Sequence, residues 1–268
     1  MTETRRQLAL YLLFAAIVLT GVGLRLVNLD HLPMYLDETT HIFRAHAIHT
    51  DGQWFLGLTT NKALYPIALA ALYPLGPEGP WLARMLSVLC GVISMAAATG
   101  LGKALGDWRV GLLAGLFYAL IPMAVFHERQ ALVDPMMAMF TTLTTLFAVW
   151  LVRKPSIGLA VLLSLSLAGG YLTKAPALLF FGVPLAAVVL LSTDWKQAGR
   201  ALAHILPAIV AGGLAIYAVY EIAANQGFVP NNNQVSGNRL RLLTLNDPST
   251  IDAILRDYGN FQEFMTGY

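Results

Sequence analysis

The sequence predicts an all-α protein, a polytopic membrane bundle of about seven transmembrane helices. Of its 268 residues, 57% are hydrophobic and only 12% are charged, whereas charged residues make up roughly 25% of an average soluble domain. The mean hydropathy is +0.62. The apolar residues also fall into long segments separated by short polar connections, as membrane-spanning helices do.

Seven segments are each close to the length that a hydrocarbon core of about 30 Å requires. They cover residues 8–27, 81–105, 110–126, 132–152, 157–173, 176–192 and 201–224. Residues 63–75 are apolar but shorter, and they contain Pro66 and Pro74. We expect an interfacial or re-entrant helix there. The first segment has no small-residue cleavage pattern, so it is expected to remain as a signal anchor.

Basic residues in the short loops predict the orientation. If the helices alternate in direction, four pairs fall on one side: Arg5 and Arg6, Lys103 and Arg109, Arg153 and Lys154, and Lys196 and Arg200. We expect this side, with the N-terminus, to face the cytoplasm, and the membrane to be a bacterial cytoplasmic membrane. The outer side then receives the loop 28–80, the turns at 127–134 and Lys174, and residues 225–268.

This pattern divides the chain into a transmembrane module, residues 1–224, and an extracytoplasmic tail, residues 225–268. The tail is more polar, and Pro248 and Ser249 are typical of the start of a short outer helix. Because the chain ends within an outer segment, we interpret the tail as the start of a C-terminal part that this chain lacks.

Composition disfavours a nucleic-acid partner and excludes an intrachain disulfide. A net charge of +2 without a run of Lys and Arg argues against a nucleic-acid partner. A lone cysteine, Cys90, cannot form an intrachain disulfide.

The first polar interruption of the apolar pattern is the acid pair Asp37 and Glu38. If Asp37 caps a helix, then Asp37, His41 and Arg44 lie on one stripe, and Glu38 and His49 lie on the adjoining stripe. This arrangement presents an acidic base beside a cation. The alternative is a solvated juxtamembrane helix whose charges face water.

Two further interruptions are predicted to open on the same outer face. Glu128 and Arg129 lie in a very short connection, where ionisable groups are costly unless they are paired or hydrated. Asp134 precedes Pro135, so helix capping would also explain it. Lys174 lies in a tight turn, where it could bind the phosphate of a lipid headgroup or simply extend toward water.

A metal site is a weaker hypothesis. His41 and Asp37 are the candidate ligands, since nitrogen and carboxylate ligands suit zinc or manganese. The histidine spacing matches no metal motif closely. We therefore expect no required cofactor and keep a divalent metal as an alternative.

Four motifs in this order resemble membrane glycosyltransferases of the GT-C fold. They are Leu36-Asp37-Glu38, Trp81 to Arg84, Arg129 to Pro135, and Leu172 to Pro176. The chain is most similar to the branch that contains protein O-mannosyltransferases and the aminoarabinose transferase of lipid A. The resemblance covers nearly the whole chain but only the front half of such proteins, which are about twice as long.

The resemblance implies transfer of a hexosyl or pentosyl group from a polyprenyl-phosphate-linked donor to an acceptor on the outer side. It implies that Asp37 is the general base, that Asp134 is a second acid and that Lys174 contacts the donor phosphate. Including their neighbours, the candidate catalytic residues are Asp37, Glu38 and Asp134, and the candidate substrate-binding residues are Arg44, Arg84, Glu128, Arg129 and Lys174.

The expected partners are the lipid-linked donor, membrane lipids, and a partner protein or the missing C-terminal part. We therefore expect little activity from this chain alone. One alternative is a non-catalytic membrane subunit that binds lipid or partner helices. Another is a transporter, which the absence of evident broken helices disfavours.

Overall fold

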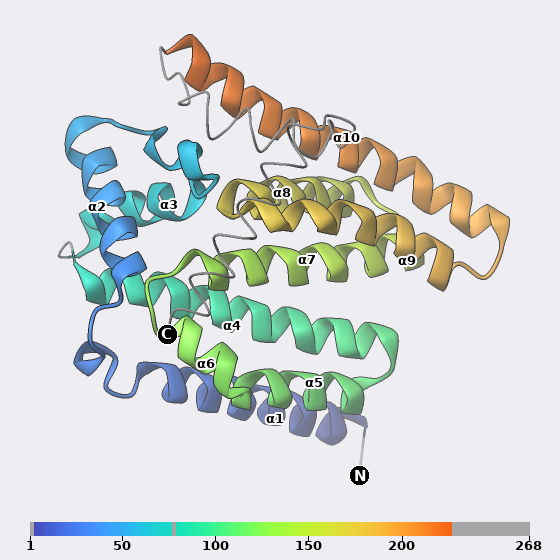
Figure 1. Ribbon diagram of the computed structural model, residues 1–268. Coiled ribbons are helices and arrows are strands. Elements are labelled where there is room, and N and C mark those ends of the chain that lie inside the picture. Colours follow the sequence, from blue (N-terminus) through green and yellow to red (C-terminus); the bar gives the residue numbers. More distant parts are fainter. Residues whose placement is uncertain (1–2, 77–78, 227–268) are drawn as a thin grey trace, which may run out of the picture. The chain divides into compact units, whose positions relative to one another are not determined.

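The computed structural model describes residues 3–76 and 79–226, and within these ranges every regular element is helical (Figure 1). One compact unit comprises Met1–Ile222. The predicted tail helix near residue 248 lies outside the described residues, so it and the domain boundary at residue 224 remain predictions.

Ten α-helices and four short 3-10 helices follow one another in this part of the chain. The α-helices are α1 Glu3–Leu26, α2 Leu36–Asp51, α3 Leu64–Leu72, α4 Pro80–Leu105, α5 Trp108–Leu120, α6 Pro122–Glu128, α7 Val133–Arg153, α8 Ile157–Thr173, α9 Val183–Leu191 and α10 Trp195–Asn225. The 3-10 helices are η1 Leu29–His31, η2 Leu56–Thr60, η3 Tyr73–Leu75 and η4 Ala175–Gly182.

Four of these helices, α1, α4, α7 and α10, are long and apolar enough to cross a bilayer, and α5 with α6 makes a fifth if the bent pair is one span. Helix α8 and the η4–α9 segment are apolar but shorter. The all-helical membrane bundle is thus confirmed, and the number of seven spans stays a prediction.

Two of the predicted helices are interrupted. The predicted segment 110–126 divides into α5 and α6, which are bent by 60°. Pro122 explains this break, because proline lacks an N–H and keeps the preceding residue out of the helical region, and Ile121 has an extended ψ of 115°. The predicted segment 176–192 begins as η4 and becomes α-helical only at Val183.

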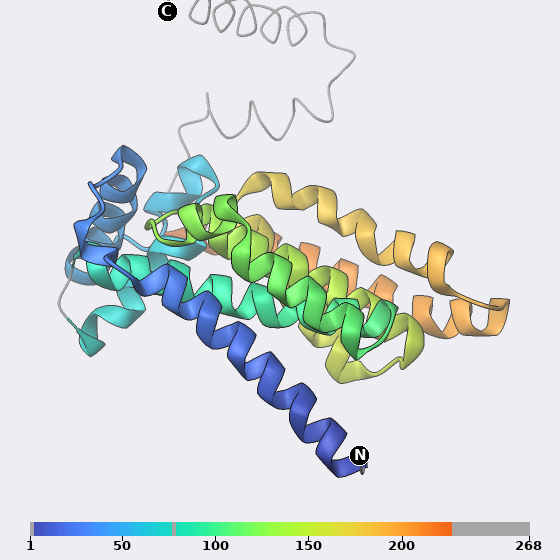
Figure 2. The same ribbon diagram turned by 90° about the horizontal axis from the view of Figure 1, so that it is seen from below.

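Successive long helices run in alternating directions, so the unit has two ends (Figure 1). The α2 end carries α2, α3 and the connections at residues 129–132 and 174. The basic end carries residues 5 and 6 and the connections at 106–107, 154–156 and 192–194. Helices α4 and α7 lie side by side in the middle, and Figure 2 shows the N-terminal half of α1 diverging from α4.

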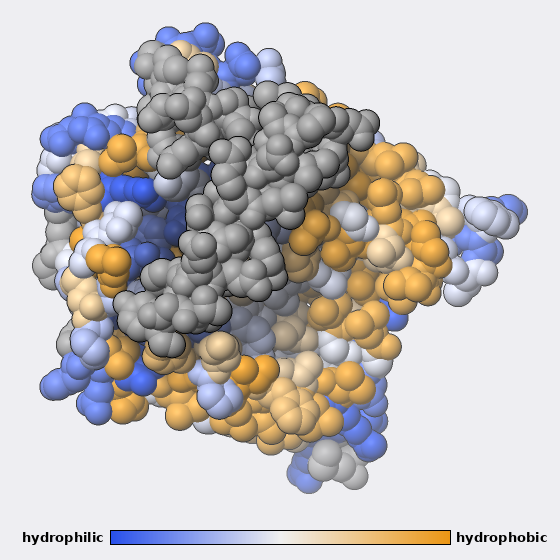
Figure 3. All heavy atoms as spheres, viewed as in Figure 1, coloured by the Kyte–Doolittle hydropathy of each residue, from blue (hydrophilic) through white to orange (hydrophobic). Residues whose placement is uncertain are grey.

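The surface and the interior both fit a lipid environment. In Figure 3 apolar side chains cover much of the visible bundle, while polar ones gather at its ends. Leu179, Val189 and Leu190 are each about 80% exposed. Exposed apolar side chains of this kind suit contact with lipid chains.

Two apolar cores hold the unit together. One joins α2 and α3 to α4 and α7, with Ile48, Tyr65 and Leu69 almost fully buried. The other joins α7, α8, α9 and α10 around residues such as Leu163 and Ile205. The first core fixes α2 on the bundle, and α2 carries Asp37, His41 and Arg44 of the candidate site.

Candidate functional site

Helix α2 begins two residues earlier than a cap at Asp37 would require, so the hypothesis that Asp37 caps it was wrong. Tyr35 is the N-cap residue, with extended backbone angles of −83° and 148°. Its N–H donates to Glu38 Oε2 at 2.8 Å. Glu38, the third residue of the helix, therefore provides the hydrogen-bond acceptor for the backbone N–H of the N-cap residue. Asp37 is left exposed.

The Glu38 carboxylate forms a buried ion pair with Arg84 on α4. Arg84 Nε donates to Oε1 at 2.8 Å and Arg84 Nη2 donates to Oε2 at 2.9 Å. The N–H of Ala131 donates to Oε1 at 2.7 Å. Burial by itself raises the pKa of Glu38. These donors and the N–H of Tyr35 together lower it by more, so the pKa lies below its ordinary value.

Arg84 also holds the segment that leads into α2. Its Nη1 donates to the carbonyl oxygen of Leu29 at 2.7 Å and its Nη2 donates to that of Pro33 at 3.4 Å. Glu38 and Arg84 are 0% and 2% exposed. We infer that this pair positions α2 rather than contacting a substrate.

Glu128 forms a second buried ion pair, with Arg25 of α1. Arg25 Nε lies 2.5 Å from Glu128 Oε2, and the Tyr118 hydroxyl donates to Oε1 at 2.7 Å. Gly91 makes room for this carboxylate, since a Cβ there would collide with it. Arg25 was not among the predicted site residues, although a charge inside an apolar span is a recognisable signal.

Six other side chains form a more open group at the α2 end, which we call the open cluster. Its members are Asp37, His41, Arg44, Lys62, Asp134 and Lys174. Lys62 Nζ lies 4.0 Å from Asp37 Oδ2, and the Asp37 side chain is 53% exposed. Lys174 Nζ donates to Asp134 Oδ1 at 2.7 Å, and both side chains are about one third exposed.

Asp134 joins this group because α7 starts at Val133, with Leu132 as the N-cap. The alternative explanation, that Asp134 caps the helix, was therefore wrong. An acid in the first turn still interacts favourably with the helix dipole, and its carboxylate is free to pair with Lys174 from the α8–η4 turn.

His41 is the buried member of the open cluster and is 1% exposed. Its ring packs edge-on against Tyr65, with 5.5 Å between centroids. Neither ring nitrogen has a hydrogen-bond partner among the described residues. A buried unpartnered polar group is costly, so His41 is a candidate for a contact made only with a ligand.

The charges around His41 favour its neutral form. Burial lowers its pKa to about 4, the positive charges of Lys62 and Arg44 act in the same direction, and Asp37 and Asp134 oppose them. The ring is therefore a neutral imidazole near pH 7, with one donor and one acceptor.

Two arginines complete the predicted set. Arg44 Nη1 donates to Thr60 Oγ1 at 3.0 Å; burial lowers the pKa of Arg44, and Asp37 opposes this shift. Arg129 Nη2 donates to the carbonyl oxygen of Val27, while its buried Nε has no partner in the described structure. Arg129 thus retains a donor for an anionic ligand.

Residues 62–205 match a family model described as dolichyl-phosphate-mannose-protein mannosyltransferase. The chain belongs to this family. The match covers just over half of the chain, and it places the protein among membrane glycosyltransferases of the GT-C type. No curated protein matches the chain.

The family match includes some members of the open cluster and leaves out others. Lys62, Asp134 and Lys174 lie within it, whereas Asp37 and His41 precede it. In this glycosyltransferase the roles of the individual residues therefore rest on geometry. Sequence reasoning did not single out Lys62, whose place beside Asp37 depends on the α2–α3 connection.

The metal hypothesis gains no geometric support. Within residues 3–76 and 79–226, no three His, Cys, Asp or Glu side chains are grouped so that they could hold an ion. His41 and Asp37 would need a further ligand, because protein zinc sites ordinarily use three or four protein ligands. The metal remains a prediction.

Proposed function

We propose that this membrane glycosyltransferase transfers a sugar from a polyprenyl-phosphate-linked donor to an acceptor hydroxyl at the α2 end, on the extracytoplasmic side of a bacterial cytoplasmic membrane. The observation that carries the proposal is the open cluster, where exposed carboxylates and cations lie together. The family's lipid-linked donor fits this chemistry.

In the proposed step the acceptor oxygen attacks the anomeric carbon, and the bond from that carbon to the phosphate oxygen breaks. The acceptor proton passes to the Asp37 carboxylate, and the polyprenyl phosphate leaves with the bonding electrons. A carboxylate beside the nucleophile and cations beside the departing phosphate are what this single displacement needs.

Lys174 and Arg129 are the proposed phosphate contacts. Lys174 is partly exposed and exchanges its Asp134 partner for a stronger anion when the donor binds. Arg129 retains an unpartnered Nε. Asp134 then becomes available as the second acid, to bind a sugar hydroxyl.

Asp37→Asn tests the proposed base. The amide keeps the shape of the side chain but cannot accept the proton, so turnover should fall on the order of a hundredfold or more while donor binding persists. The assay follows transfer of radiolabelled sugar from a polyprenyl-phosphate donor in native membranes of the source cell, where any partner that the chain needs is present. Cross-linking of a photoreactive polyprenyl-phosphate sugar measures binding independently of turnover.

Asp51→Asn is the matched control, because it removes an exposed carboxylate from the other end of the same helix. It should leave both readouts unchanged. Normal transfer by Asp37→Asn would exclude Asp37 as the base. Donor binding without transfer by the unaltered chain in these native membranes would instead favour the alternative of a non-catalytic lipid-binding subunit.

A further inference from the structure

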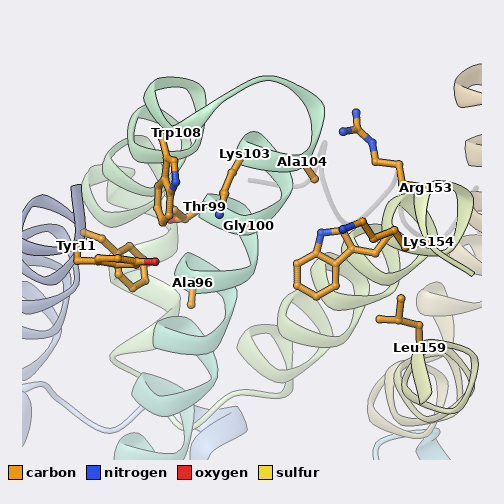
Figure 4. A pocket seen from close by; sticks show the side chains of 12 residues that line it. Tyr11, Ala96, Thr99, Gly100, Lys103, Ala104, Trp108, Arg153, Lys154 and Leu159 are labelled. Atoms are coloured by element: carbon orange, nitrogen blue, oxygen red, sulfur yellow. The ribbon is translucent and has the colours of Figure 1, made fainter. Parts of the chain in front are cut away.

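A cavity of about 730 Å³ lies at the basic end, opposite the open cluster. Its walls come from α1, α4, α5, α7 and α8. Figure 4 shows Tyr11 and Trp108 on one side, Arg153 and Lys154 on the other, and Lys103 of α4 between them. The divergence of α1 from α4 leaves room for the cavity (Figure 2).

The cavity concentrates positive charge. Lys103, Arg153 and Lys154 all line it, and none of them forms an ion pair with a carboxylate in the part of the chain that the structure describes. Lys103 Nζ instead lies 4.1 Å from the centroid of the Trp108 ring. Contact with an aromatic ring does not neutralise the positive charge of Lys103.

Two acids at this end, Asp107 and Asp194, are engaged elsewhere. Asp107 accepts hydrogen bonds from the backbone N–H groups of Arg109 and Val110 at 2.8 and 3.1 Å. Asp194 accepts one from the N–H of Gln197 at 2.8 Å. Both carboxylates cap helix starts, so they do not neutralise the cavity.

The remaining lining is apolar and aromatic. Tyr11, Trp108 and Trp150 surround the cavity, and Tyr11 is more than half exposed at the side of the bundle. Aromatic rings of this kind mark the level of lipid headgroups. Below them, Ala96, Gly100 and Leu159 provide an apolar surface along which acyl chains can lie.

We propose that this cavity binds an anionic glycerophospholipid, with its phosphate at Lys103, Arg153 and Lys154 and its acyl chains against Ala96 and Leu159. Basic pockets between membrane helices suit such headgroups. This site is separate from the proposed donor site. Arg84 and Lys103 lie on the same helix, roughly 28 Å apart at 1.5 Å per residue.

The test compares lipids that differ only in headgroup. The purified chain is placed in mixed micelles with dioleoyl phosphatidylglycerol or dioleoyl phosphatidylcholine, and bound lipid is counted by native mass spectrometry. A further sample contains phosphatidylglycerol together with a polyprenyl phosphate as a competing anionic lipid. We expect a tightly retained phosphatidylglycerol. The double variant Lys103→Gln/Arg153→Gln should weaken its retention at least tenfold.

Lys196→Gln/Arg200→Gln is the matched control, since it removes one lysine and one arginine from the same end but outside the cavity. Retention should then change by less than twofold. Ala96→Phe fills the acyl part without changing charge, and it should also reduce retention. Circular dichroism and elution volume establish that each variant is folded.

Three outcomes would overturn the proposal. Equal losses in the two double variants would mean diffuse attraction to the basic end. Equal retention of phosphatidylcholine would remove the role of the cations. Preferential retention of a polyprenyl phosphate would assign the cavity to a different lipid.

Discussion

Glu38 and Arg84 are 46 positions apart in the chain and share two buried hydrogen bonds, of 2.8 and 2.9 Å, that join α2 to α4. Asp37, the neighbour of Glu38, lies instead at the surface, where Lys62 Nζ is 4.0 Å from its Oδ2. Two adjacent acids therefore have different tasks: one holds the helix that carries the candidate site, and the other is available for chemistry.

Glu38→Gln should destabilise the protein strongly. It leaves the Arg84 guanidinium buried without its anion, and breaking one partner of a buried ion pair costs about 3–5 kcal/mol. Thermal unfolding of the detergent-purified chain measures the loss. Asp37→Asn is the control and should stay within about 0.5 kcal/mol of the unaltered protein. Similar stabilities of the two variants would contradict the division of tasks.

His41 should make stability depend on pH. Its pKa is about 4 in the folded protein and 6.5 ordinarily, so the unfolded chain binds more protons between these values. The stabilisation is complete above pH 6.5 and is lost as the pH falls toward 4, by on the order of 3 kcal/mol. Unfolding temperatures of His41→Leu should therefore decrease less than those of the unaltered protein between pH 7 and pH 4.5.

The exposed His31 provides the control for this comparison. His31→Gln should keep the pH dependence of the unaltered protein. If His41→Leu and the unaltered protein lose stability in parallel as the pH falls, His41 is not the group responsible.

Lys174→Gln should weaken donor binding rather than the chemical step. It removes a proposed phosphate contact without touching the proposed base, so the donor KM should rise about tenfold or more, with a smaller change in kcat. Initial rates at varied donor concentration separate the two effects. Lys196→Gln, at the other end of the bundle, should change neither value. A lower kcat at constant KM would be inconsistent with a phosphate contact.

The orientation can be measured by cysteine accessibility. Gln53 and Ser156 are both exposed and lie at the α2 end and the basic end, respectively. In a Cys90→Ala background, Gln53→Cys should react with an impermeant thiol reagent added to intact cells, and Ser156→Cys should react only after the membrane is opened. The reverse pattern would place the open cluster in the cytoplasm.

The sequence by itself determined the helices and their order. Long apolar segments in a bilayer must satisfy their backbone groups internally, so composition alone requires helices. The predicted segment 157–173 coincides with α8. Alternation of these helices also predicted that Asp37, Asp134 and Lys174 would lie at one end, as they do. The break at Pro122 could have been predicted from the proline, but the segment 110–126 was predicted as one uninterrupted helix.

Only the tertiary structure decided which charged residues are buried. Glu38 and Asp37 are equivalent by local pattern, yet Glu38 turns toward Arg84 on another helix. Glu128 is paired with Arg25, 103 residues earlier in the chain. Burial of a charge is tolerated only where a partner neutralises it. That partner comes from a distant segment, so its position depends on how the helices pack and not on the sequence around either residue.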